Sequence, residues 1–267
     1  MFTYFFAGES GWNVSLASYA LKSFSVTTQE TIPTGLFFKP DGTAMYVVGE
    51  VNATVYQYTL STAWDVSSAS YASKSASVST QETSPEGLFF KDDGTAMYVV
   101  GLTNDTVYQY TLSTAWDVST ASYASKSFSV ATQATNPVAF FINGDGKIMY
   151  VSDNTDKVYQ YTIGTAWDIS TASYASKSFD ATSQNFSMHG CFLNPGSSSM
   201  YLLGNVVNSE VYQYTLSTSG DVSTASYTSR NFDVSTQDTQ PLDLFFRADG
   251  RVMYIIGNTD KVYQYYL

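Results

Sequence analysis

Residues 107–110 read Val-Tyr-Gln-Tyr, and the same tetrad occurs four more times, beginning at Val55, Val158, Val211 and Val262. Successive copies lie 51 to 53 residues apart. A repeat near fifty residues that is made of short apolar runs is typical of proteins in which one small unit is copied around a ring or along a stack. The tetrad therefore indicates five copies of one unit.

Each unit reads as four short strands. In the second unit, apolar residues fill 85–90 and 96–101, and the turn Asp93-Gly94 separates the two runs. A third strand follows at 106–112 and a fourth runs from about Ser122 to Val130. The first two strands do not alternate between polar and apolar residues, so both their faces should be buried, whereas the fourth is mostly Ser, Ala, Lys and Tyr. A four-stranded antiparallel sheet with this gradient of burial is typical of a propeller blade whose innermost strand comes first.

The ends of the chain predict how the ring closes. The last unit has only three strands, and residues 12–19 match residues 64–71, which lead into a fourth strand. We therefore expect an all-β, five-bladed propeller in one domain, with an N-terminal strand completing the C-terminal blade. The predicted units are 27–79, 80–131, 132–181, 182–235, and 236–267 plus 11–26. Residues 1–10 should lie outside the ring, or else Phe2–Phe6 should reach a neighbouring chain and support oligomerisation.

The run Pro-x-Gly-Leu-Phe-Phe-x-x-Asp-Gly-x-x-Met-Tyr-Val-Val occurs at Pro33–Val48 and at Pro85–Val100. It resembles the repeats of the NHL, YVTN and SMP-30-like propellers, which share the Asp-Gly turn and the Tyr-Val strand after it. It is also similar to repeats in predicted proteins of marine phages and bacteria. The resemblance implies a β-propeller and a virion or surface setting. In architecture the chain is also similar to the five-bladed lectin tachylectin-2, with no shared motif.

Composition and charge exclude several classes of function. The chain has only twelve Lys and Arg residues and a net charge of −11, which argues against binding to nucleic acid or to anionic membranes. No apolar run approaches the ~20 residues that span a bilayer, so we expect no membrane insertion. The start has no signal-peptide pattern, and an extracellular or virion-associated location is still favoured by the Ser/Thr-rich composition. Cys191 is single and aligns with apolar strand residues, which predicts a buried small hydrophobe.

A basic residue recurs on every fourth strand, at Lys22, Lys74, Lys126, Lys177 and Arg230. A cation on an exposed strand edge discourages pairing with another sheet. We therefore expect these side chains to be solvated.

Three repeated sets of residues are candidate ligand contacts. The loop between the second and third strands carries oxygen-bearing side chains that suit sugar hydroxyls or Ca²⁺, namely Asn52, Asn104, Asp105, Asn154, Asp156, Asn208, Glu210, Asn258 and Asp260. The loop before each innermost strand carries Gln29, Gln81, Gln133, Gln184 or Gln237, and four of the hairpins after the third strand carry Trp12, Trp64, Trp116 or Trp167. The alternative for each set is structural, since Asn and Asp form turns, Gln can tie a loop, and Trp can pack across the hairpin.

A catalytic interpretation rests on three departures from the repeat. Glu86, His189 and Asp243 stand at the start of innermost strands where the other units carry Thr, Val, Leu, Gly or Ala. Two carboxylates and a His near the centre of a ring could perform acid–base chemistry, as in five-bladed glycosidases, although no glycosidase motif is present.

Five similar sites favour a non-enzymatic module that binds glycans weakly at each site and gains avidity from several sites together. The alternative is a structural or protein-docking module of a virion or cell-surface assembly. We accordingly expect no enzymatic activity and no cofactor, with Ca²⁺ as the one candidate ion, and a glycan or a surface protein as the partner.

Overall fold

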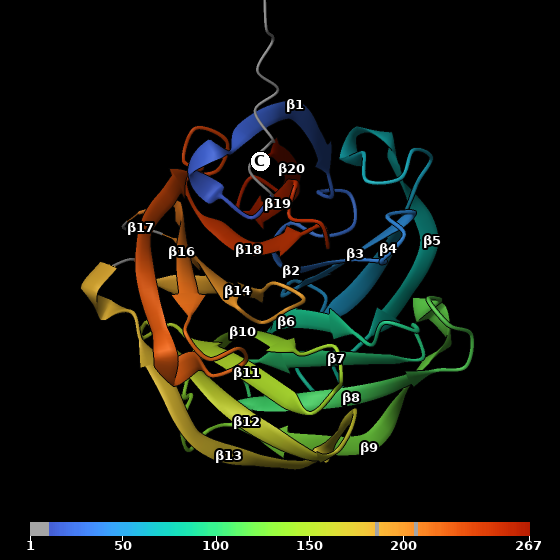
Figure 1. Cartoon of the computed structure of the whole chain (residues 1–267). Coiled ribbons are helices and arrows are strands. Elements are labelled where there is room, and N and C mark those ends of the chain that lie inside the picture. The colour runs from blue at the N-terminus through green and yellow to red at the C-terminus, as the bar shows by residue number, and fades with distance from the viewer. Residues whose placement is uncertain (1–10, 185–186, 206–207) are drawn as a thin grey trace, which may run out of the picture.

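The protein is a five-bladed β-propeller in a computed structural model that describes residues 11–184, 187–205 and 208–267. Figure 1 looks close to the axis of the ring, with β18, β2, β6, β10 and β14 nearest the centre. Each sheet has four antiparallel strands, and short 3₁₀ turns are the only helical elements in the described residues. None of the described residues form a helix long and apolar enough to cross a membrane.

The blades have these strands. Blade 1 holds β2 (Pro33–Phe38), β3 (Ala44–Gly49), β4 (Thr54–Leu60) and β5 (Ala69–Ser77). Blade 2 holds β6 (Pro85–Phe90), β7 (Ala96–Gly101), β8 (Thr106–Leu112) and β9 (Ala121–Ser129). Blade 3 holds β10 (Pro137–Ile142), β11 (Ile148–Asp153), β12 (Lys157–Thr165) and β13 (Asp168–Asp180). Blade 4 holds β14 (Met188–Leu193), β15 (Ser199–Gly204), β16 (Glu210–Leu216) and β17 (Ala225–Asp233). Blade 5 holds β18 (Pro241–Phe246), β19 (Val252–Gly257), β20 (Lys261–Tyr266) and β1 (Ser18–Ser25).

Short 3₁₀ turns precede the fourth strand in four blades and one inner strand. They are η1 (Val14–Leu16), η2 (Val66–Ser68), η3 (Val118–Thr120), η5 (Val222–Thr224) and, before β14, η4 (Thr182–Gln184).

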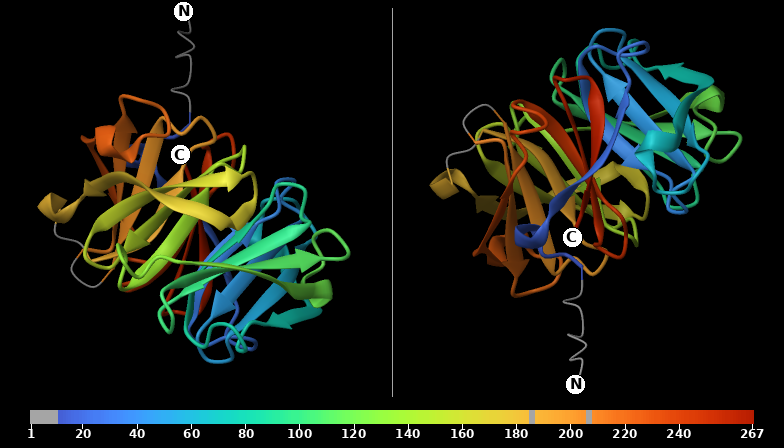
Figure 2. Two further views of the ribbon diagram at one scale, coloured as in Figure 1. Left: turned by 90° about the horizontal axis from the view of Figure 1, so that it is seen from below. Right: turned by 90° about the horizontal axis from the view of Figure 1, so that it is seen from above.

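The predicted gradient of burial is confirmed. All residues of β6 and β7 are buried, whereas exposed and half-buried residues alternate along β9. The ring closes as predicted, because β1 pairs with β20 in an antiparallel register that places Phe24 opposite Val262. Figure 2 shows β1, in blue, beside the red C-terminal strands. Closure by β1 gives the backbone groups of β20 a partner that they would otherwise lack.

Three sets of hydrogen bonds link each blade to the next around the whole ring. A buried Tyr on each second strand donates its hydroxyl to a backbone carbonyl in the next blade at 2.8 to 3.0 Å, as Tyr46 does to Trp116. The Gln of each tetrad accepts a backbone N–H from the next blade at 3.1 to 3.3 Å, as Gln57 does from Val118. The tetrad thus supplies the links between blades as well as the third strand.

The third set corrects the prediction that the fourth-strand cations are simply solvated. Lys22, Lys74, Lys126 and Lys177 each bond an Asp of the next blade at 2.6 to 2.7 Å. The Lys74 ammonium group holds the pKa of Asp117 below its usual range. At the junction of blades 4 and 5 the corresponding residues are Arg230 and Asn13, and Arg230 has no carboxylate partner among the described residues.

Candidate functional site

The two faces of the ring differ in chemistry. On one face lie the starts of the innermost strands and the loops between second and third strands, with Glu50, Glu82 and Glu86; we call it the acidic face. On the opposite face lie the ends of the innermost strands and the hairpins that follow them; we call it the aromatic face.

A β-bulge re-aims one side chain at the acidic end of each innermost strand. The register shifts between Pro85 and Gly87 in blade 2, and at the same place in the other four blades. The residues in the bulges are Thr34, Glu86, Val138, His189 and Leu242. Two of the three predicted catalytic candidates, Glu86 and His189, therefore occupy equivalent bulges around the axis. Bulges are common beside active sites because they turn a side chain away from the regular pleat.

Glu86 is paired with a second carboxyl group from the neighbouring blade. Its side chain is only 7% exposed. Burial, a hydrogen bond with Glu50, and the charges of Glu50 and Glu82 raise the pKa of Glu86 to about 9. Glu86 is thus protonated at neutral pH and can donate to Glu50. Glu50 is half-buried and also accepts a hydrogen bond of 2.6 Å from the Ser84 hydroxyl.

Glu50 was missed by the sequence analysis. It follows the second strand of blade 1, where the other units carry Leu102, Asn154, Asn205 and Asn258. The departure from the repeat was visible, but its contact with Glu86 joins two different blades. No pattern within one unit could reveal that contact.

Among the described residues, neither His189 nor Asp243 is hydrogen-bonded to this pair. Burial lowers the pKa of His189, so its ring is neutral at neutral pH, and its Nδ1 lies 3.1 Å from the Ser187 carbonyl oxygen. Asp243 is a bridge between blades, because its two oxygens accept the backbone N–H groups of Leu36 at 2.7 Å and Leu244 at 2.8 Å. Burial raises the pKa of Asp243 to about 8. Of the three predicted residues, Glu86 alone has a neighbour suited to proton transfer.

Further carboxylates are buried beneath the acidic face and hold loops. Glu82 is fully buried, and its Oε1 accepts the backbone N–H groups of Ser84 and Thr103. Glu30 and Asp238 do the same in blades 1 and 5. In blade 3 the carboxylate that holds the loop belongs to the second strand, where Asp153 accepts the backbone N–H of Asn136 at 2.9 Å. Among the described residues no three His, Cys, Asp or Glu side chains are grouped to hold a metal ion.

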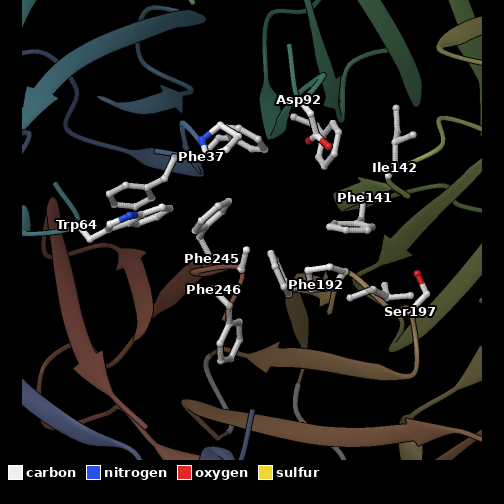
Figure 3. A pocket seen from close by; sticks show the side chains of 16 residues that line it. Phe37, Trp64, Asp92, Phe141, Ile142, Phe192, Ser197, Phe245 and Phe246 are labelled. Carbon is white, nitrogen blue, oxygen red and sulfur yellow. The ribbon is translucent and has the colours of Figure 1, made fainter. Parts of the chain in front are cut away.

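The aromatic face has a closed ring of phenylalanines at its centre. Each blade contributes one: Phe37, Phe89, Phe141, Phe192 and Phe245. Neighbouring ring centroids lie 5.3 to 5.6 Å apart at interplanar angles of 63° to 75°, the edge-to-face geometry that aromatic pairs favour. A cavity of about 320 Å³ opens above this ring on the aromatic face, and Figure 3 shows Phe37, Phe141, Phe192 and Phe245 around it.

The structure gives structural partners to many of the predicted ligand contacts. Each predicted Gln accepts a hydrogen bond from a third-strand Tyr hydroxyl at 2.9 to 3.5 Å, as Gln81 does from Tyr110. These residues tie the loop before a blade to that blade's own third strand.

The Asn and Asp side chains on the acidic face are spread around the ring. The Asn52 amide donates to Tyr56, the Asn104 amide donates to the Gln81 carbonyl, and Asp156 accepts the Met188 N–H at 2.7 Å. Glu210 bonds Asn231, Asn258 bonds Gln240, and Asp260 accepts from Thr27. Asp105 takes a positive φ of 46°, and Asn154 and Asn208 form backbone turn bonds. A direct role of this set in ligand contact stays a prediction.

The four Trp side chains pack against the hairpins on the aromatic face. Trp64 stacks on Phe38 with centroids 5.9 Å apart, and a Cβ on Gly42 would lie 2.4 Å from its indole. The same Gly–Trp pair occurs at Gly94, Gly146 and Gly250. In blade 4 both partners change together, to Ser197 and Gly220, so the hairpin keeps its fit without a Trp.

Cys191 is buried as predicted and has no disulfide. Burial holds the pKa of its thiol far above the usual range, which makes it a poor nucleophile at neutral pH.

Solved propellers share this fold at low sequence identity. The periplasmic gluconolactonase PpgL of Pseudomonas aeruginosa matches with a TM-score of 0.54 and 14% identity over 85% of this chain and 64% of its own. A putative 6-phosphogluconolactonase of Bacteroides uniformis matches with a TM-score of 0.52 and 13% identity over 84% of this chain and 64% of its own. The propeller domain of Cps50 (Swd1) from Myceliophthora thermophila matches at 0.53 and 9% identity, over 94% and 99%. The chain therefore spans less than two-thirds of the length of either gluconolactonase, and these likenesses establish the fold.

The sequence itself also matches a known family. No curated protein matches the chain. The family model described as "Lactonase, 7-bladed beta-propeller" matches residues 12–166, more than half of the chain. This match overturns the prediction of a non-enzymatic module, whether glycan-binding or docking, because the family is one of enzymes. With five blades where the family description has seven, the chain belongs to the lactonase family of β-propellers.

Proposed function

We propose that this protein is a lactonase-like hydrolase that opens a cyclic ester at the acidic face of the ring. The observation that carries the proposal is the Glu86–Glu50 carboxyl pair, in which the buried Glu86 is hydrogen-bonded to Glu50 and holds its proton at neutral pH. Two carboxyl groups with different proton affinities are the usual requirement for one acid and one base in a single site. Membership of the lactonase family supports this reaction class.

The pair can supply both proton transfers of lactone hydrolysis. The Glu50 carboxylate takes a proton from water as the water oxygen bonds to the lactone carbonyl carbon. The tetrahedral adduct then expels the ring oxygen, and the Glu86 carboxylic acid gives its proton to that oxygen as the ring C–O bond breaks. The products are a hydroxyl and a carboxylic acid on one molecule. Transfer of one proton from Glu50 to Glu86 across their shared hydrogen bond restores the starting pair.

The elements around the pair suit these two roles. Glu86 stands in the bulge of β6, and burial keeps it protonated. Glu50 lies on a loop and is half-buried, so water can reach it, while the Ser84 hydroxyl orients it. The neutral His189 ring belongs to the equivalent bulge of blade 4.

The test is hydrolysis of a lactone panel, with glucono-δ-lactone, δ-valerolactone and γ-butyrolactone, followed by proton release above the uncatalysed rate. Glu86→Gln and Glu50→Gln should each lower kcat by at least about 100-fold, since general acid–base groups contribute that much or more. Asp233→Asn removes an exposed carboxylate on the fourth strand of blade 4, which belongs to none of the candidate sets, and it should leave kcat unchanged. Background rates for all three lactones, or full activity of Glu86→Gln, would refute the proposal.

The setting of the protein stays a prediction. An extracellular or virion-associated location, a surface protein as partner, Ca²⁺ as the one candidate ion, and oligomerisation through residues 1–10 are untested, and residues 1–10 lie outside the described residues. The likeness to NHL, YVTN and SMP-30-like repeats and to phage proteins also stays a prediction beyond the propeller fold itself.

A further inference from the structure

The cavity on the aromatic face is separate from the Glu86–Glu50 pair. The two lie on opposite faces of the propeller, and the five phenylalanines around the axis lie between them. The cavity measures about 320 Å³, within the range of pockets that hold small molecules. Its floor is this ring, and Trp64, Ile142 and Leu193 are among the other apolar side chains that line it.

One charged side chain breaks the apolar lining. The first residue of the turn after each innermost strand lines the cavity, and four of the five are Pro40, Gly144, Pro195 and Ala248. The fifth is Asp92, the only charged residue that lines the cavity in the described part of the chain. Figure 3 shows it beside the aromatic rings.

The Asp92 carboxylate is available to a ligand. Its neighbour Asp93 is engaged by the Lys91 ammonium group at 2.7 Å and by the Thr95 hydroxyl at 2.6 Å. Asp92 has no such hydrogen bond or ion pair with any described residue. Asp92 is exposed at the edge of the cavity, where its carboxylate can form a charge-assisted hydrogen bond with a cationic ligand.

We propose that this cavity binds a small organic cation, with an aromatic or branched alkyl body on the phenylalanine ring and an ammonium group at Asp92. The apolar body leaves water for a concave surface of aromatic rings. The ammonium group meets the Asp92 carboxylate and the negative faces of the aromatic rings, which also attract cations. The net charge of −11 raises the local concentration of cations around the protein.

Three probes that share a phenyl ring separate the contributions of shape and charge: phenethylammonium, 2-phenylethanol and phenylacetate. Titration of the full chain, followed by ligand-detected NMR or calorimetry at low salt, should show saturable binding of phenethylammonium. The neutral alcohol should bind on the order of tenfold more weakly, because it lacks a charge-assisted hydrogen bond. The anion should show no saturable binding.

Two variants and their matched controls locate the site. Asp92→Asn should remove the preference for the cation and leave binding of the alcohol, whereas Asp41→Asn makes the same charge change in another blade and should alter neither. Gly144→Leu should abolish binding of both, because a Cβ at Gly144 has no heavy atom within 4 Å and its side chain would enter the cavity. Gly196→Leu is the control, since a Cβ there has only the Ser198 hydroxyl within 4 Å, at 3.9 Å, and Gly196 does not line the cavity.

The result that would overturn the proposal is equal binding of cation and alcohol by the unmodified protein, or cation binding that survives Gly144→Leu. Absence of saturable binding of all three probes would do so as well. Glu86→Gln should bind the cation as the unmodified protein does, so this proposal and the proposed hydrolase activity stand or fall separately.

Discussion

At the scale of single residues, Glu86 links stability to pH. Its pKa rises from an ordinary value of 4.5 to about 9 in the folded protein, with burial as the largest cause. The folded state therefore favours the protonated form. Its stabilising contribution is complete below pH 4.5 and is lost as pH rises toward 9. Asp243, with a pKa of about 8, acts in the same direction.

We expect the free energy of unfolding to fall between pH 5 and pH 9, by about 1.4 kcal/mol for each unit by which a pKa is raised. Glu86→Gln should flatten the curve, because an amide in the same place does not ionise. Asp243 remains in that variant, so part of the slope should persist. Urea unfolding at a series of pH values measures this. Parallel curves for the two proteins would show that Glu86 is not protonated in the folded state.

The Gly–Trp pairs predict a coupling between two residues. Gly42→Ser alone should destabilise blade 1, because a Cβ at Gly42 would lie 2.4 Å from Trp64. Trp64→Gly alone should cost about 3–5 kcal/mol by leaving a void. The double variant copies Ser197 and Gly220 of blade 4, so its loss should be smaller than the sum of the two single losses by at least about 1 kcal/mol. Losses that simply add would contradict the pairing.

At the scale of elements, the junction between blades 4 and 5 lacks the ion pair found at the other four. The Asn13 side chain caps η1 by accepting the backbone N–H of Ser15, as the Asp65 side chain caps η2 by accepting that of Ser67. Asn13→Asp should therefore keep the cap and add an ion pair with Arg230. The gain should be small, about 0.2–1 kcal/mol, and should shrink with added salt.

A double-variant comparison checks this. Asn13→Asp in an Arg230→Gln background should give no gain in the midpoint of thermal unfolding. An equal gain in both backgrounds would assign the effect to the cap and not to Arg230.

The elements also show how far sequence reasoning reaches. The tetrad and the Asp-Gly turns placed the strands within one or two residues, because strand period and turn chemistry are local. The match of residues 12–19 to residues 64–71 predicted the closing strand. The Lys–Asp pairs, the phenylalanine ring and the Glu50–Glu86 contact were not predicted, since each joins residues of different blades and leaves no pattern inside one unit. The lactonase relationship was missed because five like units suggested five like sites, whereas the candidate acid and base each occur once.

At the scale of the whole molecule, the ring depends on one strand that comes from the far end of the chain. Removal of residues 1–26 leaves β20 with an unpaired edge. We expect that truncated chain to lose cooperative unfolding and to aggregate. A circular permutant that carries residues 11–26 after Leu267, joined by a copy of Ser61 and Thr62, should restore a single unfolding transition. Failure of the permutant to fold would mean that β1 must be made first.

The paired changes at Ser197 and Gly220 bear on how such a ring can diversify. The residues that fit the two hairpins together, such as Ser197 and Gly220, belong to one blade. The Tyr hydroxyls that link to the next blade donate to backbone carbonyls, which are present in every residue type. A complete blade can thus be exchanged by recombination without loss of these Tyr links. A crossover between the two hairpins of one blade would instead combine a Trp with a residue that carries a Cβ, as Ser197 does, at the position of Gly42. Inheritance in whole-blade cassettes would let a single blade acquire an acid or a base while the other four keep the ring intact.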